Sequence, residues 1–178
     1  MRPFGFQDIT PVIDFLYRGP REIPFFQSID LETWPTENEY RRRLTEMAQN
    51  PTQWPTVAVE YRGRTIGMHM LDQGNFIALI WNSMDRGQGV SAVSWFKACQ
   101  YFFENFGTEM IYFRIPKDNA MALNAAKKLP LTAAGEEDMR VPGFKLGMRV
   151  KLYTLSRDDF DRLNSTDDGD EVDEESDL

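Results

Sequence analysis

The chain has 178 residues, enough for one globular domain with a sizeable core and too few for two independent domains. Its single cysteine excludes an internal disulfide framework and a cysteine-based zinc site, and its single histidine argues against a structural metal centre, so we expect no metal. The formal net charge is −8, but residues 164–178 hold eight acidic residues and no basic one, which leaves a near-neutral body of 20 basic and 20 acidic residues. Such a body gives no support for binding nucleic acid.

Hydropathy and charge indicate a domain followed by a tail. No run of eighteen apolar residues occurs, and no signal-type apolar segment follows Met1, so we expect a cytoplasmic protein without a membrane partner. Residues 1–160 should form the domain. Residues 161–178 should form a disordered acidic tail, because they have too little apolar surface to offset the entropy of ordering. The tail either keeps the chain soluble or docks onto a basic protein partner.

The first part of the chain predicts two helices and a β-hairpin. Apolar residues at helical spacing predict a short amphipathic helix over Asp8–Tyr17. A capping-box pattern predicts a second helix over about Glu37–Gln49. Two β-rich runs, Thr56–Tyr61 and Arg64–Leu71, flank a tight turn at Arg62-Gly63, which is the pattern of a hairpin.

A third strand and a crossover follow the hairpin. The strand Asn75–Asn82 completes an antiparallel meander. A helix over Val90–Phe106 then precedes a strand at Glu109–Ile115, and this crossover makes the two strands parallel. An alanine-rich helix over Asn119–Leu129, a loop and a final strand over Met148–Leu155 close the domain. The apolar face of the long helix is placed on the stripe Val93, Phe96, Lys97, Gln100 and Phe103.

The most informative motif is the glycine-containing turn Asp85–Ser91, which joins the third strand to the long helix. Glycines without Cβ let a phosphate approach the backbone. The first N–H groups of a helix then point at the anion, with the positive end of the helix dipole behind them. Turn chemistry explains most glycines at such junctions, so the loop by itself is either an anion site or an ordinary turn.

The element order brings out a family resemblance. Over about residues 1–160, the order of the expected elements resembles that of the GNAT superfamily of acyl-CoA-dependent N-acyltransferases. This order is helix, helix, three antiparallel strands, glycine loop, helix, strand, helix and strand. Arg86-Gly87-Gln88-Gly89-Val90-Ser91 is similar to the pyrophosphate loop of that superfamily, Arg/Gln-x-x-Gly-x-Gly/Ala. Arg2-Pro3-Phe4 looks like its opening strand, Asp118-Asn119 like the start of its next helix, and Tyr153–Phe160 like its closing strand. The resemblance implies an α/β (α+β) fold with a mixed central sheet, an antiparallel N-terminal meander, parallel fourth and fifth strands, and helices on both faces.

The resemblance also implies acetyl-CoA as a co-substrate. In the superfamily, a V-shaped opening between the fourth and fifth strands takes the pantetheine arm like an extra strand, and the pyrophosphate rests on the glycine loop. By position, the implied contacts are Ile80, Trp81 and Asn82 for pantetheine, Arg86, Gly87, Gln88, Gly89, Val90 and Ser91 for pyrophosphate, and Asn119 for the far end of the cofactor.

The chain departs from the superfamily at two catalytic positions. The tyrosine that often protonates the departing thiolate falls on Ala126, and the strand Asn75–Asn82 has no carboxylate to act as a general base. Glu60 and His69, on neighbouring strands, are the candidate replacement bases. Glu60 is otherwise a solvent-facing strand residue, and His69 a hydrogen-bonded histidine half buried in the sheet. Cys99 is interpreted as a small buried residue rather than a nucleophile.

Two functional hypotheses follow. The first is a GNAT-type N-acetyltransferase that transfers acetyl from acetyl-CoA to an amine of a small molecule or protein by direct attack. The alternative is a GNAT fold without catalysis that serves as an interaction or structural protein. Some tailed phages encode GNAT-like proteins with eroded motifs, so such a protein would act in the host cytoplasm or in the virion. Edge-strand pairing also leaves a homodimer open.

Overall fold

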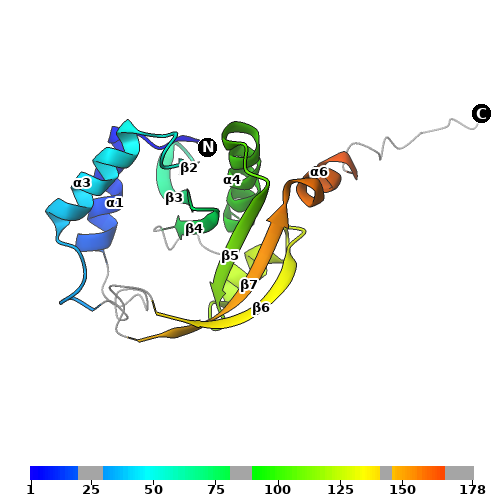
Figure 1. Ribbon diagram of the computed structural model, residues 1–178. Coiled ribbons are helices and arrows are strands. Elements are labelled where there is room, and N and C mark those ends of the chain that lie inside the picture. Colours follow the sequence, from blue (N-terminus) through cyan, green and yellow to red (C-terminus); the bar gives the residue numbers. More distant parts are fainter. Residues whose placement is uncertain (20–29, 81–89, 141–145, 167–178) are drawn as a thin grey trace, which may run out of the picture.

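The computed structural model describes residues 1–19, 30–80, 90–140 and 146–166. In these residues seven strands form one sheet in the order β1-β2-β3-β4-β5-β7-β6, in which only β4 and β5 pair in parallel (Figure 1). The strands are β1 (Arg2–Pro3), β2 (Thr56–Tyr61), β3 (Arg64–Asp72), β4 (Asn75–Ile80), β5 (Met110–Pro116), β6 (Thr132–Met139) and β7 (Met148–Ser156). The helices are α1 (Phe6–Arg18), α3 (Glu37–Gln49), α4 (Val90–Phe106), α5 (Ala120–Ala126) and α6 (Arg157–Thr166).

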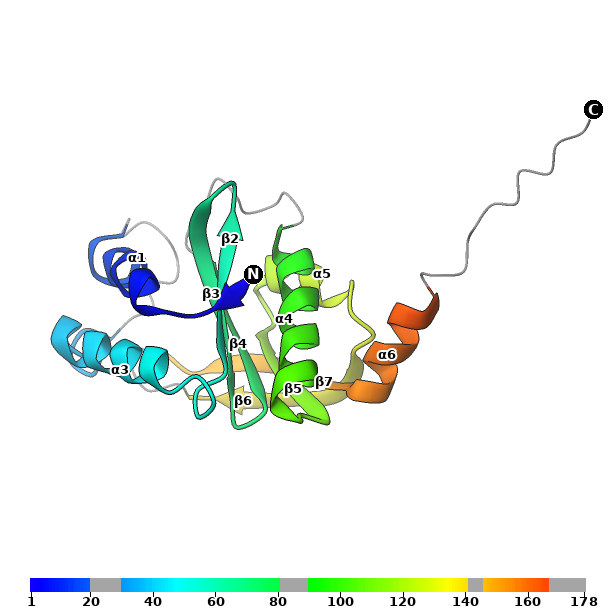
Figure 2. The same cartoon turned by 90° about the horizontal axis from the view of Figure 1, so that it is seen from above.

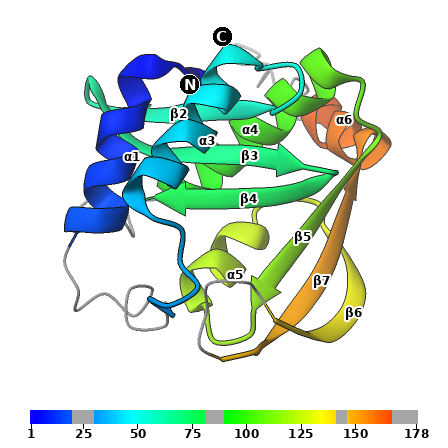
Figure 3. The same cartoon turned by 60° about the vertical axis from the view of Figure 1, so that its left-hand side comes forward.

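Helices cover both faces of the sheet. α1 and α3 lie over one face, and α4 and α5 lie over the other, as Figures 2 and 3 show from two sides. The implied fold class is therefore confirmed: an antiparallel N-terminal meander, parallel fourth and fifth strands of the predicted set, and helices on both faces. Within the four described ranges, no helix is both long enough and apolar enough to cross a membrane.

In both N-terminal helices, the N-cap amide donates to a carboxylate three residues later, and α3 has a complete capping box. At α1, the Gly5 N–H donates to the Asp8 carboxylate at 2.9 Å. At α3, the Thr36 N–H donates to the Glu39 carboxylate at 2.8 Å, and the Glu39 N–H donates to the Thr36 hydroxyl at 3.3 Å. These bonds satisfy amide groups that the first turn of a helix leaves without partners. Both predicted helices are confirmed, the second with the predicted bounds.

The predicted meander β2-β3-β4 is confirmed, and each of its two turns holds a pair of left-handed residues. The φ angles are 49° at Arg62 and 73° at Gly63, then 47° at Gln73 and 83° at Gly74. Pairs of this kind form type I′ turns, whose twist matches that of the flanking strands. The second turn makes Asp72 and Asn75 the closing pair of the β3-β4 hairpin.

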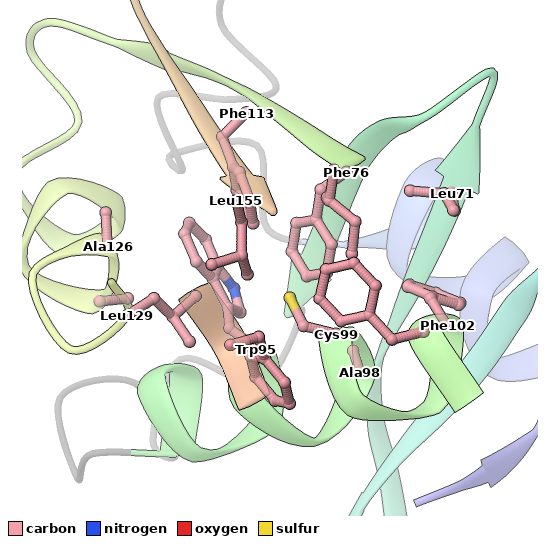
Figure 4. Close-up of a cluster of buried hydrophobic side chains, with 14 of the residues drawn as sticks. Leu71, Phe76, Trp95, Ala98, Cys99, Phe102, Phe113, Ala126, Leu129 and Leu155 are labelled. Atoms are coloured by element: carbon pink, nitrogen blue, oxygen red, sulfur yellow. The ribbon is translucent and has the colours of Figure 1, made fainter. Parts of the chain in front are cut away.

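Buried apolar side chains form two groups, one on each face of the sheet. The larger group lies between the sheet and α4, α5 and α6 (Figure 4). Phe76 of β4 is central to it, with ring centroids 4.9 Å from Phe113 and 5.3 Å from Trp95. The smaller group, which includes Leu44 and Met68, lies between the sheet and α1 and α3. The sheet is therefore buried on both faces where these helices cover it.

The buried face of α4 differs from the predicted stripe. Among the stripe residues only Phe103 is buried, and Val93 is 58% exposed. The helix carries aromatic rings on several sides, and Phe96 packs against Phe160 of α6, so the spacing of apolar residues does not select one face. The residues that α4 buries are Ser94, Trp95, Ala98, Cys99, Phe102 and Phe103.

The C-terminal part departs most from the sequence expectations. β6 lies at the edge of the sheet, where we expected a loop. Its residues are mostly exposed and include Glu136-Glu137-Asp138, so the segment lacks the alternation that indicates a strand. Gly135, with φ of 111°, lies at a register shift against β7. β7 ends at Ser156, and the residues up to Phe160 belong to α6 rather than to a closing strand.

Two boundaries also move. α5 ends at Ala126, three residues before the predicted end, and the chain then turns before Pro130. α6 continues to Thr166, across the expected end of the domain at residue 160, and buries Phe160 in the larger apolar group. Residues 167–178 of the predicted tail lie outside the described residues.

Candidate functional site

β4 and β5 meet at one point and then part. Their pairing is limited to Asn75 and Tyr112, where the Tyr112 N–H donates to the Gly74 carbonyl at 2.8 Å. β4 stays paired with β3 along its whole length, and β5 stays paired with β7 from Met110 to Pro116. The two strands therefore diverge toward their C-terminal ends, which Figure 3 shows from the α1 and α3 side. This divergence is the opening that the resemblance implies.

Backbone groups of both strands face this opening. Successive residues of a strand direct their N–H and C=O groups to opposite edges. Because Tyr112 donates toward β4, the backbone of Arg114 also faces β4, and Pro116 there has no N–H to offer. On β4, Asn75 bonds toward β3 as the closing pair of the hairpin, so the backbone of Ala78 faces the opening. An extended ligand with amide groups can pair with such edges.

A cavity of about 120 Å³ lies at the opening, between the two strands and the helices α4 and α5. Its lining combines apolar residues, among them Ala78, Trp95, Phe113 and Ala122, with the polar residues Arg114 and Asn119. Of the two polar residues that line the cavity, Asn119 is the uncharged one. Ligand pockets for whole drug-sized molecules measure about 300–1,000 Å³, so this cavity fits only the end of a long ligand. The remainder of such a ligand would extend along the strand edges.

Asn119 caps α5 beside this cavity. Its side-chain oxygen accepts a hydrogen bond from the Ala122 N–H at 3.1 Å. The cap uses the side-chain oxygen of Asn119, a residue that lines the cavity, and an amide side chain also carries an NH₂ group that can donate. The sequence-predicted contact between Asn119 and the far end of a cofactor stays a prediction, and the position of the residue is compatible with it.

The glycine loop is described only at its end. Val90 and Ser91 form the first two residues of α4, and Ser91 lies one helical turn before Trp95, which lines the cavity. Like every helix, α4 leaves its first N–H groups without partners inside the helix, so its start is suited to an anion. The other predicted contacts of this segment, Trp81, Asn82, Arg86, Gly87, Gln88 and Gly89, lie outside the described residues. Ile80, the last residue of β4, is partly buried.

His69 lies in the middle of β3 and is fully buried against α4. Its Nε2 is 2.9 Å from the Ser94 hydroxyl, and that hydroxyl donates to the Ser91 carbonyl at 3.0 Å. Burial lowers the pKa of His69 to about 3, so the ring is neutral at physiological pH. His69 has no exposed surface from which to take a proton from an acceptor. Its role as a base stays a prediction that these contacts do not favour.

Glu60 lies near the tip of the β2-β3 hairpin, on a strand separated from β4 by β3. Arg2 of β1 donates to its carboxylate at 3.0 Å and to the Asp8 carboxylate at 2.7 Å. Burial alone would raise the pKa of Asp8, but hydrogen bonds from Arg2, the Gly5 N–H and Thr65 outweigh it and hold the pKa below its usual value. Glu60 thus belongs to a cluster that fastens β1 and α1. It is not brought together with His69, and its role as a base also stays a prediction.

Two further residues occupy the larger apolar group rather than the opening. Cys99 is fully buried, and burial raises the pKa of its thiol, which disfavours the thiolate that a nucleophile needs. Ala126, at the position where the superfamily often has its tyrosine, is 5% exposed and packs in the same group.

Sequence reasoning missed a polar cluster around Arg114 of β5. The Arg114 guanidinium donates to the Glu137 carboxylate of β6 at 2.8 Å and to the side-chain oxygen of Asn75 on β4. The cluster ties β4, β5 and β6 together where the opening begins. Its members are 23 and 39 residues from Arg114 in sequence, and one of them is on the unpredicted strand β6, so no local pattern indicates it.

Comparisons with known proteins place these features in context. No protein-family model matches the chain, and no curated protein matches its sequence. A solved structure of the aminoglycoside acetyltransferase AAC(6')-Ib with coenzyme A and kanamycin is similar, with a TM-score of 0.68 at 14% identity over 92% of this chain and 97% of that chain. The microcin self-immunity acetyltransferase MccE with acetyl-CoA and AMP gives 0.68 at 10% identity, over 86% and 89%. A chimera of the spermidine N-acetyltransferase SpeG from Vibrio cholerae gives 0.70 at 15% identity, over 90% and 98%.

At these low sequence identities, the similarity establishes the fold alone. It extends over nearly the whole length of each chain, and the element order and the parted β4 and β5 agree with the resemblance drawn from the sequence. The chain therefore has the fold of the GNAT N-acetyltransferases.

Proposed function

We propose that the chain is an N-acetyltransferase that transfers acetyl from acetyl-CoA to an amine by direct attack. The observation that carries the proposal is the opening between β4 and β5, with its strand edges and a cavity that Trp95 of α4 helps to line. The thioester end of acetyl-CoA fits the cavity, the amide groups of pantetheine fit the strand edges, and the pyrophosphate fits the helix start.

The proposed reaction needs little side-chain chemistry. The amine nitrogen forms a bond to the carbonyl carbon of the thioester, the carbon–sulfur bond breaks, and the amine proton passes through water to the departing thiolate. Ala126 cannot donate a proton, so water takes the part that a tyrosine often has in this fold. Holding the two reactants in line supplies most of the rate, since proximity and orientation lower the barrier by about 7–11 kcal/mol.

The acceptor is an amine on a small molecule or a protein. The related structures include an enzyme solved with kanamycin and a spermidine N-acetyltransferase, so enzymes of this fold act on amines of different kinds. For this chain we place the acceptor on the face of the opening that carries Ile77 and Tyr112, because both side chains are exposed there.

A second candidate is a protein of the same fold that has lost catalysis and serves as a binding or structural subunit, in a phage virion for example. Two observations favour it. Ala126 is buried where the fold often has its tyrosine, and the described part of β4, Asn75–Ile80, carries no carboxylate. The two candidates differ in one measurable property, since only the enzyme releases free coenzyme A when an amine is present.

The test measures binding first and turnover second. Calorimetry with acetyl-CoA should give a dissociation constant in the micromolar range for the wild type and no binding for Gly89→Glu, whose carboxylate repels the pyrophosphate. Gln53→Glu is the matched control, because it adds the same charge in an exposed turn before β2 and should bind like the wild type. Release of thiol with a panel of amines then separates the two candidates. A wild type that binds no acetyl-CoA contradicts the proposal.

A further inference from the structure

The contacts of His69 join the centre of the sheet to the first turn of α4. His69 is opposite Ala78 in the β3-β4 pairing, and Ala78 lines the cavity at the opening. Both His69 and Ser94 are buried, at 0% and 4% exposure. The two residues are 25 positions apart in sequence, and their side chains meet at 2.9 Å. A buried polar contact of this kind fixes the helix relative to the strand more narrowly than apolar packing does.

Ser94 in turn forms a hydrogen bond with one peptide group of α4. Its hydroxyl donates to the carbonyl of Ser91 at 3.0 Å. A peptide group is planar, so holding the Ser91 carbonyl also fixes the direction of the N–H on the other side of the same peptide bond, which belongs to Ala92. Ala92 is the third residue of α4, and its N–H is among the first groups of the helix that have no partner inside it.

The second ring nitrogen of His69, Nδ1, helps to explain why the contact with Ser94 matters. Among the described residues, no group meets the geometry of a full hydrogen bond to the buried Nδ1, and the backbone of Met68 is the group close enough to favour the protonated ring. An unpaired buried polar atom lowers stability, and an aromatic residue such as phenylalanine would fill a similar volume without such an atom. What a histidine adds at this position, compared with a phenylalanine, is therefore its hydrogen bond with Ser94.

We propose that His69 and Ser94 are positioning residues that orient the first turn of α4 for the pyrophosphate of acyl-CoA. The inference rests on the proposed function, because it assumes that a coenzyme A ligand occupies the opening. It assigns to His69 a part in cofactor binding and none in proton transfer. The predicted signature is a loss of affinity that depends on the pyrophosphate of the ligand.

The test compares two ligands by calorimetry: coenzyme A, and pantetheine, which has the same arm but lacks the pyrophosphate and the nucleotide. Ser94→Ala and His69→Phe should each weaken coenzyme A about tenfold, because misdirecting a charge-assisted hydrogen bond costs about one power of ten in affinity. The same variants should change the dissociation constant of pantetheine, titrated to millimolar concentration, less than twofold. His69→Gln keeps an N–H donor in the site and should restore much of the affinity for coenzyme A.

Cys99→Ala is the matched control, since it also removes an atom from the buried face of α4 but leaves the hydrogen bonds in place. It should leave the affinity ratio of the two ligands unchanged. Equal losses for coenzyme A and pantetheine, or an equal change of the ratio in Cys99→Ala, would overturn the inference and leave the proposed function intact. A folded wild type that binds neither ligand would overturn the proposed function and this inference with it.

Discussion

At the scale of single residues, burial decides which polar groups can act. His69 was a candidate base on the strength of its residue type, yet the structure encloses it completely between β3 and α4. Ser94, which the sequence placed in no site, is its hydrogen-bond partner. Burial favours the neutral form of such a side chain, so its residue type alone does not show what it does.

The buried imidazole predicts a pH dependence of stability. Burial lowers the pKa of His69 to about 3 in the folded chain, whereas the unfolded chain binds the proton near its ordinary value of 6.5. Between these two pKa values the unfolded chain binds more protons than the folded chain. The contribution of the neutral, buried His69 to the free energy of unfolding is therefore fully present above pH 6.5, and it is lost as the pH falls below that value. Urea unfolding at about pH 7.5 and 5.5 should show a loss of about 1–1.5 kcal/mol. His69→Gln cannot take up the proton, and an equal loss in that variant would refute the assignment.

At the scale of elements, β3 and β4 approach each other closely at the last described residue of β4. Gly67 of β3 is paired with Ile80, the last residue of β4. A Cβ added at Gly67 would lie 2.5 Å from the Ile80 Cδ1 atom and 2.5 Å from the Leu79 carbonyl oxygen, which is too close for either atom. The glycine therefore allows the end of β4 to sit tightly on β3, and so fixes one wall of the opening.

Gly67→Ala should push the end of β4 away from β3. We expect it to lower the free energy of unfolding by about 1–3 kcal/mol, the usual cost of overpacking, and to weaken coenzyme A binding severalfold. Urea unfolding and calorimetry measure the two effects. Gly147→Ala is the matched control, because a Cβ there would have ordinary contact at 3.5 Å from the Met139 carbonyl oxygen. If Gly67→Ala behaved like this control in both measurements, Gly67 would have no part in shaping the opening.

The elements that the sequence predicted are those whose signals are local. Thr36 and Glu39 specify the start of α3 within four residues, and Arg62-Gly63 specifies a hairpin turn within two. β6 escaped prediction because an exposed edge strand needs no apolar alternation and takes its order from pairing with β7. The buried face of α4 escaped because aromatic rings surround much of the helix.

The candidate site shows the same division. The place of the opening followed from the element order and the resemblance, since it depends only on which strands are parallel. The contacts that shape the site did not, because Arg114 meets Glu137 and His69 meets Ser94 across 23 and 25 residues. Such pairs form when separate elements pack together, so the spacing of residues in a single sequence does not predict them.

At the scale of the whole molecule, the net charge belongs to the C-terminal residues. Removing residues 167–178 removes all eight of the acidic residues in 164–178 and takes the net charge from −8 to 0, with 20 basic and 20 acidic residues left. The proposed ligand carries several phosphate charges, and like charges repel over about one Debye length. The shortened chain should therefore bind coenzyme A about two- to threefold more tightly than the full chain at about 10 mM salt, where that length is about 30 Å. At about 1 M salt, where the length is about 3 Å, the two should bind equally, and calorimetry at both concentrations measures the difference.

A full-length chain with these carboxylates replaced by Asn and Gln separates the effect of charge from the effect of chain length, and should match the shortened chain. A difference that survives at high salt would instead mean that residues 167–178 touch the ligand or the opening directly, since screening does not remove a direct contact.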